Sequence, residues 1–238
     1  MIYTPETDAL VIQQPAGAPQ QLILLFHGMG SNPRAMQPLG ERLAQEFPNA
    51  LVVAPRAPTP SANGKGYQWF TFTGVTDDNR PERVAAALPA FEACVGHWQA
   101  RAGVQAPATA LVGFSQGAIM SLESSKRAQP FADRVVAIGG RYATLPLADQ
   151  AEVTVHLLHG KQDEVVPYGN AVVAAHHLRD LGGDVTAEVL PFVGHEIHPD
   201  FIDLAVLRLT THIPSRVWAK ALAADAARPP GPATPGTP

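Results

Sequence analysis

The stretch Gly113-Phe114-Ser115-Gln116-Gly117 decides the fold, because it has the form G-x-S-x-G and separates two different patterns. The apolar run Ala110-Leu111-Val112 precedes it and a helical pattern follows it. A serine on a sharp strand-to-helix turn is crowded by both elements, so only small residues fit two positions before and after it. The two glycines meet that requirement. The pattern predicts a nucleophile turn, although a glycine-rich turn in which Ser115 only caps a helix is an alternative.

Short apolar runs recur on both sides of this turn. Most are continuously apolar, which is typical of strands buried on both faces of a parallel sheet. The last run alternates more with polar residues, and we expect it near an edge of the sheet. The runs are Ala9–Ile12, Leu22–Phe26, Leu51–Ala54, Ala110–Val112, Val135–Ile138, Val153–Leu158 and Val185–Leu190.

Helical patterns alternate with these runs. Several begin at a capping residue or a proline, which favour the first turn of a helix. Alternating strands and helices imply crossover connections. We therefore predict an α/β fold with a mostly parallel central sheet and helices on both faces. The helices are expected from Pro33, from Pro81, directly after Ser115, over Asn170–Leu181, after Pro199-Asp200 and over Ser215–Ala226.

The composition is that of an ordinary globular protein. The chain has 238 residues, of which 46% are hydrophobic and 16% charged, and its net charge is −4. We expect one domain over residues 1–227 and a disordered tail of Pro, Gly, Thr and Ala over 228–238. The role of the helix over Ser215–Ala226 is not indicated by the sequence. No basic patch favours nucleic acid as a partner.

Signals for export are missing from the sequence. The first residues lack the basic and long apolar segments of a signal peptide, and no segment approaches the roughly 18 apolar residues that a membrane helix needs. A cytoplasmic location is therefore expected, and the single cysteine, Cys94, agrees with it. A homodimer is a candidate assembly, although no stretch of the sequence identifies its interface.

A serine hydroxyl becomes a strong nucleophile only beside a base that an acid orients. In this type of fold the chain order is serine, acid, histidine. Asp163 is the predicted acid, because it follows the apolar run that ends at Leu158 and so lies at the same sheet edge as Ser115. Asp133 and Asp149 are alternatives for the acid. Asp163 could also have a purely structural role in a surface turn.

Five histidines follow Asp163, and His195 is the predicted base because it lies just past the run that ends near Leu190. His198 is the serious alternative. The two histidines are three residues apart in a loop, whereas zinc proteases need histidines four apart on a helix, so we expect no metal.

An acyl transfer also needs N–H donors for the oxyanion that forms. One donor comes from the residue after the nucleophile, which is Gln116. The other is expected in the segment Phe26-His27-Gly28-Met29-Gly30, and Met29 is the predicted donor. His27 precedes the serine in the chain and is interpreted as a brace for this loop.

Four motifs together resemble the phospholipase/carboxylesterase family, which includes acyl-protein thioesterases, lysophospholipase-like enzymes and small bacterial esterases. The resemblance covers about residues 8–210. It implies an α/β-hydrolase fold, no cofactor, and hydrolysis of carboxylic esters or thioesters, with the nucleophile, acid, base and oxyanion donors on the residues given above. The motifs are Leu25-Phe26-His27-Gly28-Met29-Gly30, Gly113-Phe114-Ser115-Gln116-Gly117, His159-Gly160-Lys161-Gln162-Asp163-Glu164-Val165-Val166-Pro167 and Gly194-His195-Glu196-Ile197.

The chain departs from that family in two respects, of which the first is the helix from Ser215 with its Pro-rich tail, additional to the family pattern. Eukaryotic thioesterases of the family carry an aspartate soon after the His-Gly-x-Gly segment, whereas Ser31-Asn32-Pro33 stands here. The sequence looks closer to the bacterial esterase branch. An acyl-protein thioesterase or a lysophospholipase remains an alternative, as does a non-catalytic relative that binds a ligand.

The long segment Pro55–Asn79 shows little regular pattern and is the predicted substrate loop. It carries four aromatic residues within six positions, Tyr67, Trp69, Phe70 and Phe72. Family members use the equivalent loop to line or cover the acyl pocket. The alternative is that these aromatics only pack the loop onto the core.

Overall fold

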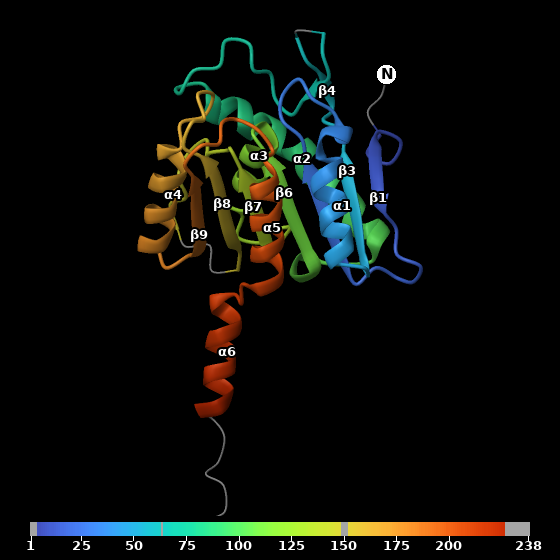
Figure 1. Cartoon of the computed structure of the whole chain (residues 1–238), viewed down its shortest axis with the longest axis vertical. Coiled ribbons are helices and arrows are strands. Elements are labelled where there is room, and N and C mark those ends of the chain that lie inside the picture. Colours follow the sequence, from blue (N-terminus) through green and yellow to red (C-terminus); the bar gives the residue numbers. More distant parts are fainter. Residues whose placement is uncertain (1–3, 63, 149–151, 227–238) are drawn as a thin grey trace, which may run out of the picture.

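Seven strands form one twisted sheet in a computed structural model that describes residues 4–62, 64–148 and 152–226 (Figure 1). All neighbouring strands run parallel except at one edge, where β1 lies antiparallel to β3. In sheet order the strands are β1 (Ala9–Gln13), β3 (Ala50–Pro55), β2 (Gln21–Phe26), β6 (Thr109–Phe114), β7 (Arg134–Ile138), β8 (Thr154–Gly160) and β9 (Asp184–Leu190).

Helices cover both faces of this sheet, as the sequence predicts. On one face, α1 (Gln37–Glu46) and α5 (Pro199–Thr211) bury Leu39, Leu43 and Phe201 against the strands (Figure 1). On the other face lie α2 (Arg80–Ala102), α3 (Gln116–Ser124) and α4 (Gly169–Asp180), whose buried side chains include Phe91 and Trp98. Short 3-10 turns occur at Pro33–Met36 and Ala106–Ala108.

The apolar runs of the sequence are the strands of the sheet. β8 is buried at every position, and β9, whose sequence alternates more, is partly exposed and forms an edge. Both findings confirm the predicted α/β fold. The tail predicted over residues 228–238 lies outside the described residues.

The long segment between β3 and α2 contains a small hairpin that the sequence did not predict. Its strands are β4 (Thr59–Pro60) and β5 (Tyr67–Gln68), which pair antiparallel. The backbone of Tyr67 also pairs with Ser31 and Gly30 in the loop after β2, through N–O distances of 2.8 and 2.9 Å. The segment is therefore fixed to the loop that follows β2.

The last described helix, α6 (Ser215–Ala226), extends away from the body at the end of the molecule opposite to the β4–β5 hairpin (Figure 1). It buries no residue, and Val217, Trp218 and Leu222 are exposed on it. No helix in the described part of the chain combines the length and apolar character that crossing a bilayer requires.

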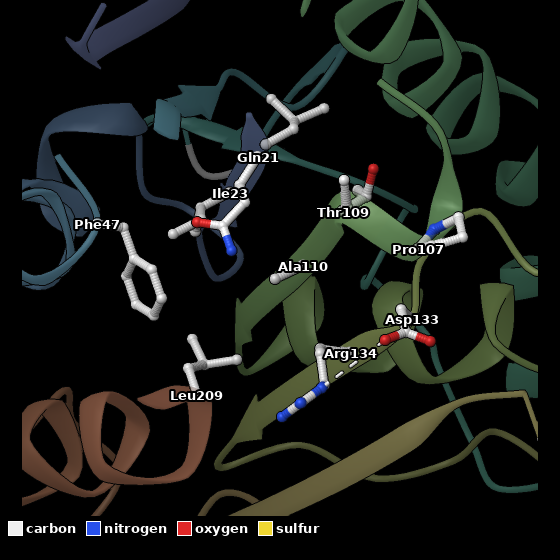
Figure 2. Close-up of a pocket in the computed structure, with 11 residues that line it drawn as sticks. Gln21, Ile23, Phe47, Pro107, Thr109, Ala110, Asp133, Arg134 and Leu209 are labelled. Atoms are coloured by element: carbon white, nitrogen blue, oxygen red, sulfur yellow. Dashed lines mark ion pairs between the residues drawn. The ribbon is translucent and has the colours of Figure 1, made fainter. Parts of the chain in front are cut away.

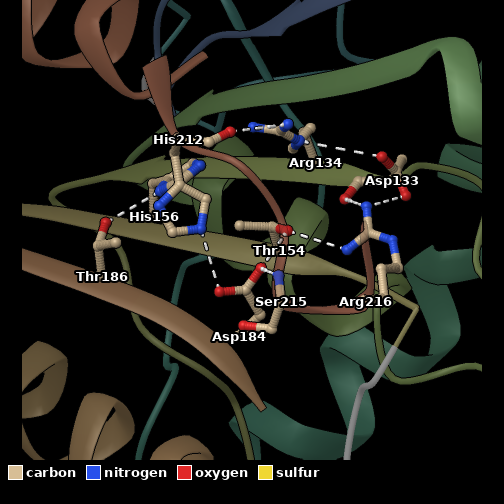
Figure 3. Close-up of polar contacts among 9 residues, drawn as sticks. All are labelled: Asp133, Arg134, Thr154, His156, Asp184, Thr186, His212, Ser215 and Arg216. Carbon is tan, nitrogen blue, oxygen red and sulfur yellow. Dashed lines mark hydrogen bonds and ion pairs between the residues drawn. The ribbon is translucent and has the colours of Figure 1, made fainter. Parts of the chain in front are cut away.

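Polar contacts fix the first turn of α6 to the amino-terminal ends of β7, β8 and β9 (Figure 3). Arg216 pairs with the carboxylate of Asp133 and donates to Thr154 Oγ1 at 3.0 Å. Asp184 accepts from the backbone N–H of Ser215 at 3.0 Å and from His212 Nε2 at 3.1 Å. The direction of α6 is thus set by charges at its base and not by apolar packing along its length.

Candidate active site

Ser115 lies at the turn from β6 to α3 in a strained backbone conformation. Its φ of 53° makes it the one non-glycine residue with positive φ in the described part of the chain. Crowding explains the flanking glycines: a Cβ on Gly117 would lie 2.1 Å from the Phe26 carbonyl oxygen, and one on Gly113 would lie 2.4 Å from the Ala118 nitrogen. The sequence pattern therefore has the steric origin that a nucleophile turn requires.

The structure brings the predicted serine, histidine and aspartate into one hydrogen-bonded chain. His195 Nε2 lies 2.9 Å from the Ser115 hydroxyl, and His195 Nδ1 lies 2.7 Å from Asp163 Oδ2. Asp163 follows β8 and His195 follows β9, so both reach the edge of the sheet where β6 ends. With the proton on Nδ1, Nε2 is free to accept the proton of the serine hydroxyl.

Both carboxylate oxygens of Asp163 have polar contacts that hold the side chain in place. Oδ1 accepts from the backbone N–H groups of Val165 and Val166 at 2.9 and 2.8 Å. His159 Nε2 lies 2.7 Å from the Val166 carbonyl oxygen and 3.2 Å from Asp163 Oδ2, so its proton sits between two acceptors. Burial lowers the pKa of His159, which favours the neutral ring.

His159 contacts the predicted acid, and the sequence alone assigns it no role. It begins the motif that ends at Pro167, but a histidine at the end of a buried strand carries no local signal of what it touches. The turn after β8 brings Asp163 back beside His159, four residues earlier, and this contact is seen only in the structure.

Two of the alternatives for the acid and the base make contacts outside the hydrogen-bonded chain. Asp133 lies at the opposite end of the sheet, paired with Arg216. His198 caps the amino terminus of α5, where its Nδ1 accepts from the Asp200 N–H. Asp149 lies outside the described residues.

The loop after β2 passes directly beside the serine. A Cβ on Gly28 would lie 3.2 Å from Ser115 Cβ, so an added side chain would press on the nucleophile. Met29 and Gln116 both line the cavity that contains Ser115. Gln116 is the first residue of α3, and a first-turn N–H has no intrahelical acceptor. The two predicted oxyanion donors therefore lie on the two segments that border the serine.

The side chain of Gln116 makes two hydrogen bonds that the predicted role of its backbone N–H does not suggest. Its Oε1 accepts from the Trp69 N–H at 2.7 Å, and its Nε2 donates to the Phe70 carbonyl oxygen at 2.8 Å. The residue after the nucleophile thus ties the long segment between β3 and α2 to the start of α3.

His27 braces the loop after β2. Its Nδ1 lies 2.7 Å from the Gly28 carbonyl oxygen, and its Nε2 accepts from the Ala57 N–H at 3.1 Å. Burial lowers the pKa of His27 to about 4, because a charged ring is costly away from water. The neutral ring joins the loop to the start of the long segment, as the brace interpretation expects.

This burial predicts an acid-sensitive stability. An unfolded histidine has a pKa of about 6.5, so between pH 6.5 and about 4 the unfolded chain binds the extra proton and the folded chain does not. The free energy of unfolding should therefore fall as the pH falls through this window, by up to about 3 kcal/mol from His27. Urea unfolding at pH 7 and pH 4.5 measures the loss.

The variant His27→Gln should lose less stability across this window than the wild type. His176→Gln, at an exposed histidine on α4, is the matched control and should keep the wild-type loss. An equal loss in His27→Gln and the wild type would show that His27 is not the titrating group.

The four aromatic residues of the long segment separate into two pairs. Phe70 and Phe72 line the cavity beside Ser115. Trp69 is buried, packs edge-on against Phe26, and donates from Nε1 to the His27 carbonyl oxygen at 3.0 Å. Tyr67 does not line the cavity, and its ring lies 4.1 Å from the Arg56 guanidinium. The packing alternative therefore describes Tyr67 and Trp69, and the pocket interpretation is kept for Phe70 and Phe72.

The cavity at the serine has a volume of about 330 Å³ and a largely apolar lining. Two arginines that the sequence interpretation did not single out also line it. The lining residues are Gly28, Met29, Ser31, Phe70, Phe72, Arg80, Phe114, Ser115, Gln116, Ile119, Arg141, Val165, Val166, Pro167 and His195. In the parts of the chain that the structure describes, no group of three or more His, Cys, Asp or Glu side chains is placed to hold a metal ion.

A smaller hollow of about 120 Å³ lies at the other end of the sheet, between the starts of β2, β6 and β7 and the end of α5 (Figure 2). Phe47, Ala110 and Leu209 contribute to its wall, and the Asp133–Arg134 pair borders it. Its lining contains neither the serine nor the histidine of the hydrogen-bonded chain, so this hollow is separate from the candidate site.

Comparison with known proteins identifies relatives over most of the chain. A family model described as phospholipase/carboxylesterase matches residues 7–213. Esterase YpfH of Escherichia coli (strain K12) is 46% identical over 215 residues, which cover 90% of this chain and 93% of that protein.

Solved structures agree with these sequence matches. The crystal structure of esterase PE8 superposes with a TM-score of 0.74 and 31% identity, covering 82% of this chain and 95% of that one. The crystal structure of Zea mays acyl-protein thioesterase 2 gives a TM-score of 0.66 at 24% identity, over 85% of this chain and 97% of that one, and shares the fold.

Proposed function

This chain belongs to the phospholipase/carboxylesterase family, and on that premise we propose that it is a serine esterase with Ser115 as nucleophile, His195 as base and Asp163 as acid. Hydrolysis of esters follows from the family and from its esterase relatives. The observation that carries the assignment of residues is the hydrogen-bonded chain from Ser115 through His195 to Asp163, at 2.9 and 2.7 Å.

The proposed reaction is a double displacement. His195 Nε2 takes the hydroxyl proton of Ser115 as Oγ attacks the acyl carbon, and the backbone N–H groups of Met29 and Gln116 stabilise the oxyanion. The imidazolium then protonates the departing alcohol or thiol. Water repeats the sequence and frees the acid. Asp163 fixes the tautomer of the neutral His195 ring and stabilises the imidazolium once it forms, and its own bonds to Val165 and Val166 keep it in place.

Small to medium acyl chains are the proposed substrates, with thioesters as a second class. A largely apolar cavity of about 330 Å³ beside the serine supports an acyl pocket of limited length. Phe70 and Phe72 are its proposed substrate-binding aromatics. Acyl-protein thioesterase or lysophospholipase activity is the second candidate, favoured by the fold shared with the maize thioesterase. The homodimer and the cytoplasmic location stay predictions from the sequence.

Two measurements test this proposal. The purified protein is assayed on p-nitrophenyl acetate, butyrate, octanoate and palmitate, and we expect turnover that declines for the longest chain. The protein is then treated with a fluorophosphonate, which modifies activated serines, and the adduct is located by mass spectrometry. We expect one adduct, on Ser115, with activity lost in proportion to labelling.

Exposed Ser215 provides an internal control, because it lies at the far end of the sheet and should stay unmodified. An adduct elsewhere would contradict the assignment of the nucleophile. If the protein hydrolyses none of the four esters, the result would favour a non-catalytic binding protein instead.

A further inference from the structure

Two cationic side chains from distant parts of the chain meet in the wall of the serine cavity. Arg80 is the first residue of α2, and Arg141 follows the end of β7 by three positions. Both line the same cavity as Ser115, and none of the cavity's lining residues is an aspartate or a glutamate. The apolar wall and the partial exclusion of water strengthen the field of these two charges inside the cavity.

A single carboxylate partly compensates these arginines. Oδ1 of Asp77 accepts from Arg80 and lies 3.2 Å from Arg141 Nη1. The Asp77 side chain is 77% exposed, whereas those of Arg80 and Arg141 are 16% and 25% exposed. The anion therefore faces the solvent and the cations face the cavity, with one positive charge in excess. Burial and the charge of Arg80 lower the pKa of Arg141, so a second anion beside the pair would relieve an existing repulsion.

The arginines also keep donors that the protein does not use. A guanidinium has five N–H donors. Besides Asp77, Arg141 donates from Nε to the Tyr142 carbonyl oxygen at 3.3 Å, and in the described part of the chain the Nη2 atoms of both arginines have no protein acceptor. These donors have the planar geometry that binds a carboxylate through two bonds.

Arg83 shows what a purely structural arginine looks like in the same region. Its guanidinium donates to the carbonyl oxygens of Thr71 and Thr73 at 3.0 and 2.7 Å and to that of Gly74 at 3.3 Å. It braces the long segment and does not line the cavity. Arg80 and Arg141 differ from it, because they line the cavity and share one exposed carboxylate, that of Asp77.

We propose that Arg80 and Arg141 form a subsite for a carboxylate carried by the substrate, so that the preferred esters are anionic close to the bond that is cleaved. This inference rests on the proposed serine esterase. The carboxylate can belong to the acyl part, as in a half ester of a dicarboxylic acid, or to the leaving alcohol.

Two matched substrate pairs distinguish these sources. For the acyl side, mono-p-nitrophenyl adipate is compared with methyl p-nitrophenyl adipate, which has the same chain without the charge. For the leaving group, 4-butyryloxybenzoate is compared with its methyl ester. The measured quantity is the ratio of kcat/KM for the charged substrate to kcat/KM for its neutral partner. We expect a ratio above one in at least one pair.

Three substitutions then test the residues. Arg80→Gln and Arg141→Gln should each lower that ratio about tenfold or more, because each removes a charge-assisted bond that only the charged substrate can make. Asp77→Asn removes the competing internal anion and should raise kcat/KM for the charged substrate severalfold. Arg179→Gln is the matched control, since Arg179 is exposed on α4 and pairs with Asp180 outside the cavity.

The outcomes separate this inference from the function on which it rests. Wild-type ratios at or below one in both pairs would overturn the subsite, and so would arginine variants that slow charged and neutral esters equally. Hydrolysis of the neutral esters by the wild type, lost in Ser115→Ala, would uphold the serine esterase in either case. A lower kcat/KM for the charged ester in Asp77→Asn would also contradict the subsite.

Discussion

Ser115→Ala is expected to lower kcat for p-nitrophenyl butyrate on the order of a millionfold, the loss found when the serine or the histidine of a serine–histidine–aspartate set is removed. The reason is chemical: alanine has no oxygen to attack the acyl carbon, and His195 Nε2, 2.9 Å from the hydroxyl in the structure, has no proton to take. His195→Ala should produce a loss of similar size. The double variant should be no worse than either single one, because the two residues act as one unit.

Steady-state hydrolysis with enzyme in high concentration measures these losses, and circular dichroism confirms that each variant is folded. His198→Ala is the matched control, since this histidine lies three residues from His195 but caps α5. It should keep activity near that of the wild type. Full activity in Ser115→Ala, or its loss in His198→Ala, would reverse the assignment of the site.

Gly117→Ala is expected to destabilise the folded protein by about 3 kcal/mol or more, by forcing two backbone segments apart. The added methyl would lie 2.1 Å from the carbonyl oxygen of Phe26 and 2.6 Å from its carbonyl carbon. Phe26 ends β2 near the centre of the sheet, and a backbone atom there cannot rotate away as a side chain can. Urea unfolding and the yield of folded protein measure the effect.

Gly96→Ala is the matched control, because the same methyl added at this position in α2 meets no atom within 4 Å. Alanine is a better helix former than glycine by about 1 kcal/mol, so this variant should be slightly more stable than the wild type. The two substitutions should therefore change the free energy of unfolding in opposite directions. A Gly117→Ala protein with the wild-type midpoint would mean that β2 and α3 can separate without loss.

Much of the fold could be predicted because its main features are local. Apolar runs such as Leu22–Phe26 identify buried strands, and the glycines on both sides of Ser115 form a short motif that is visible in the sequence, although the atom that crowds Gly117 belongs to distant Phe26. The edge at β9 was predictable from its alternation. The antiparallel pairing of β1 with β3 was not predictable, because the residue pattern of Ala9–Gln13 does not depend on the direction of the neighbouring strand.

The rest of the site depends on contacts between distant segments. Nothing near Arg80 or Arg141 in the sequence indicates that they share Asp77 or face one cavity. Aromatic clustering indicated a pocket, but it could not separate Phe70 and Phe72 from Trp69, because burial depends on where the segment folds back over Phe26. Residue type predicted the reacting groups, and tertiary structure was needed for what surrounds them.

Because the turn at Ser115 is strained, selection of variants for heat tolerance and selection for catalytic turnover favour different residues at this position. A serine at φ 53° carries a conformational cost of about 1–3 kcal/mol, which glycine would largely avoid. A library propagated only for survival of heating should therefore accumulate glycine at this position and lose its chemistry. In a library that must also cleave esters, serine should persist there, and the added robustness should arise at positions remote from the turn.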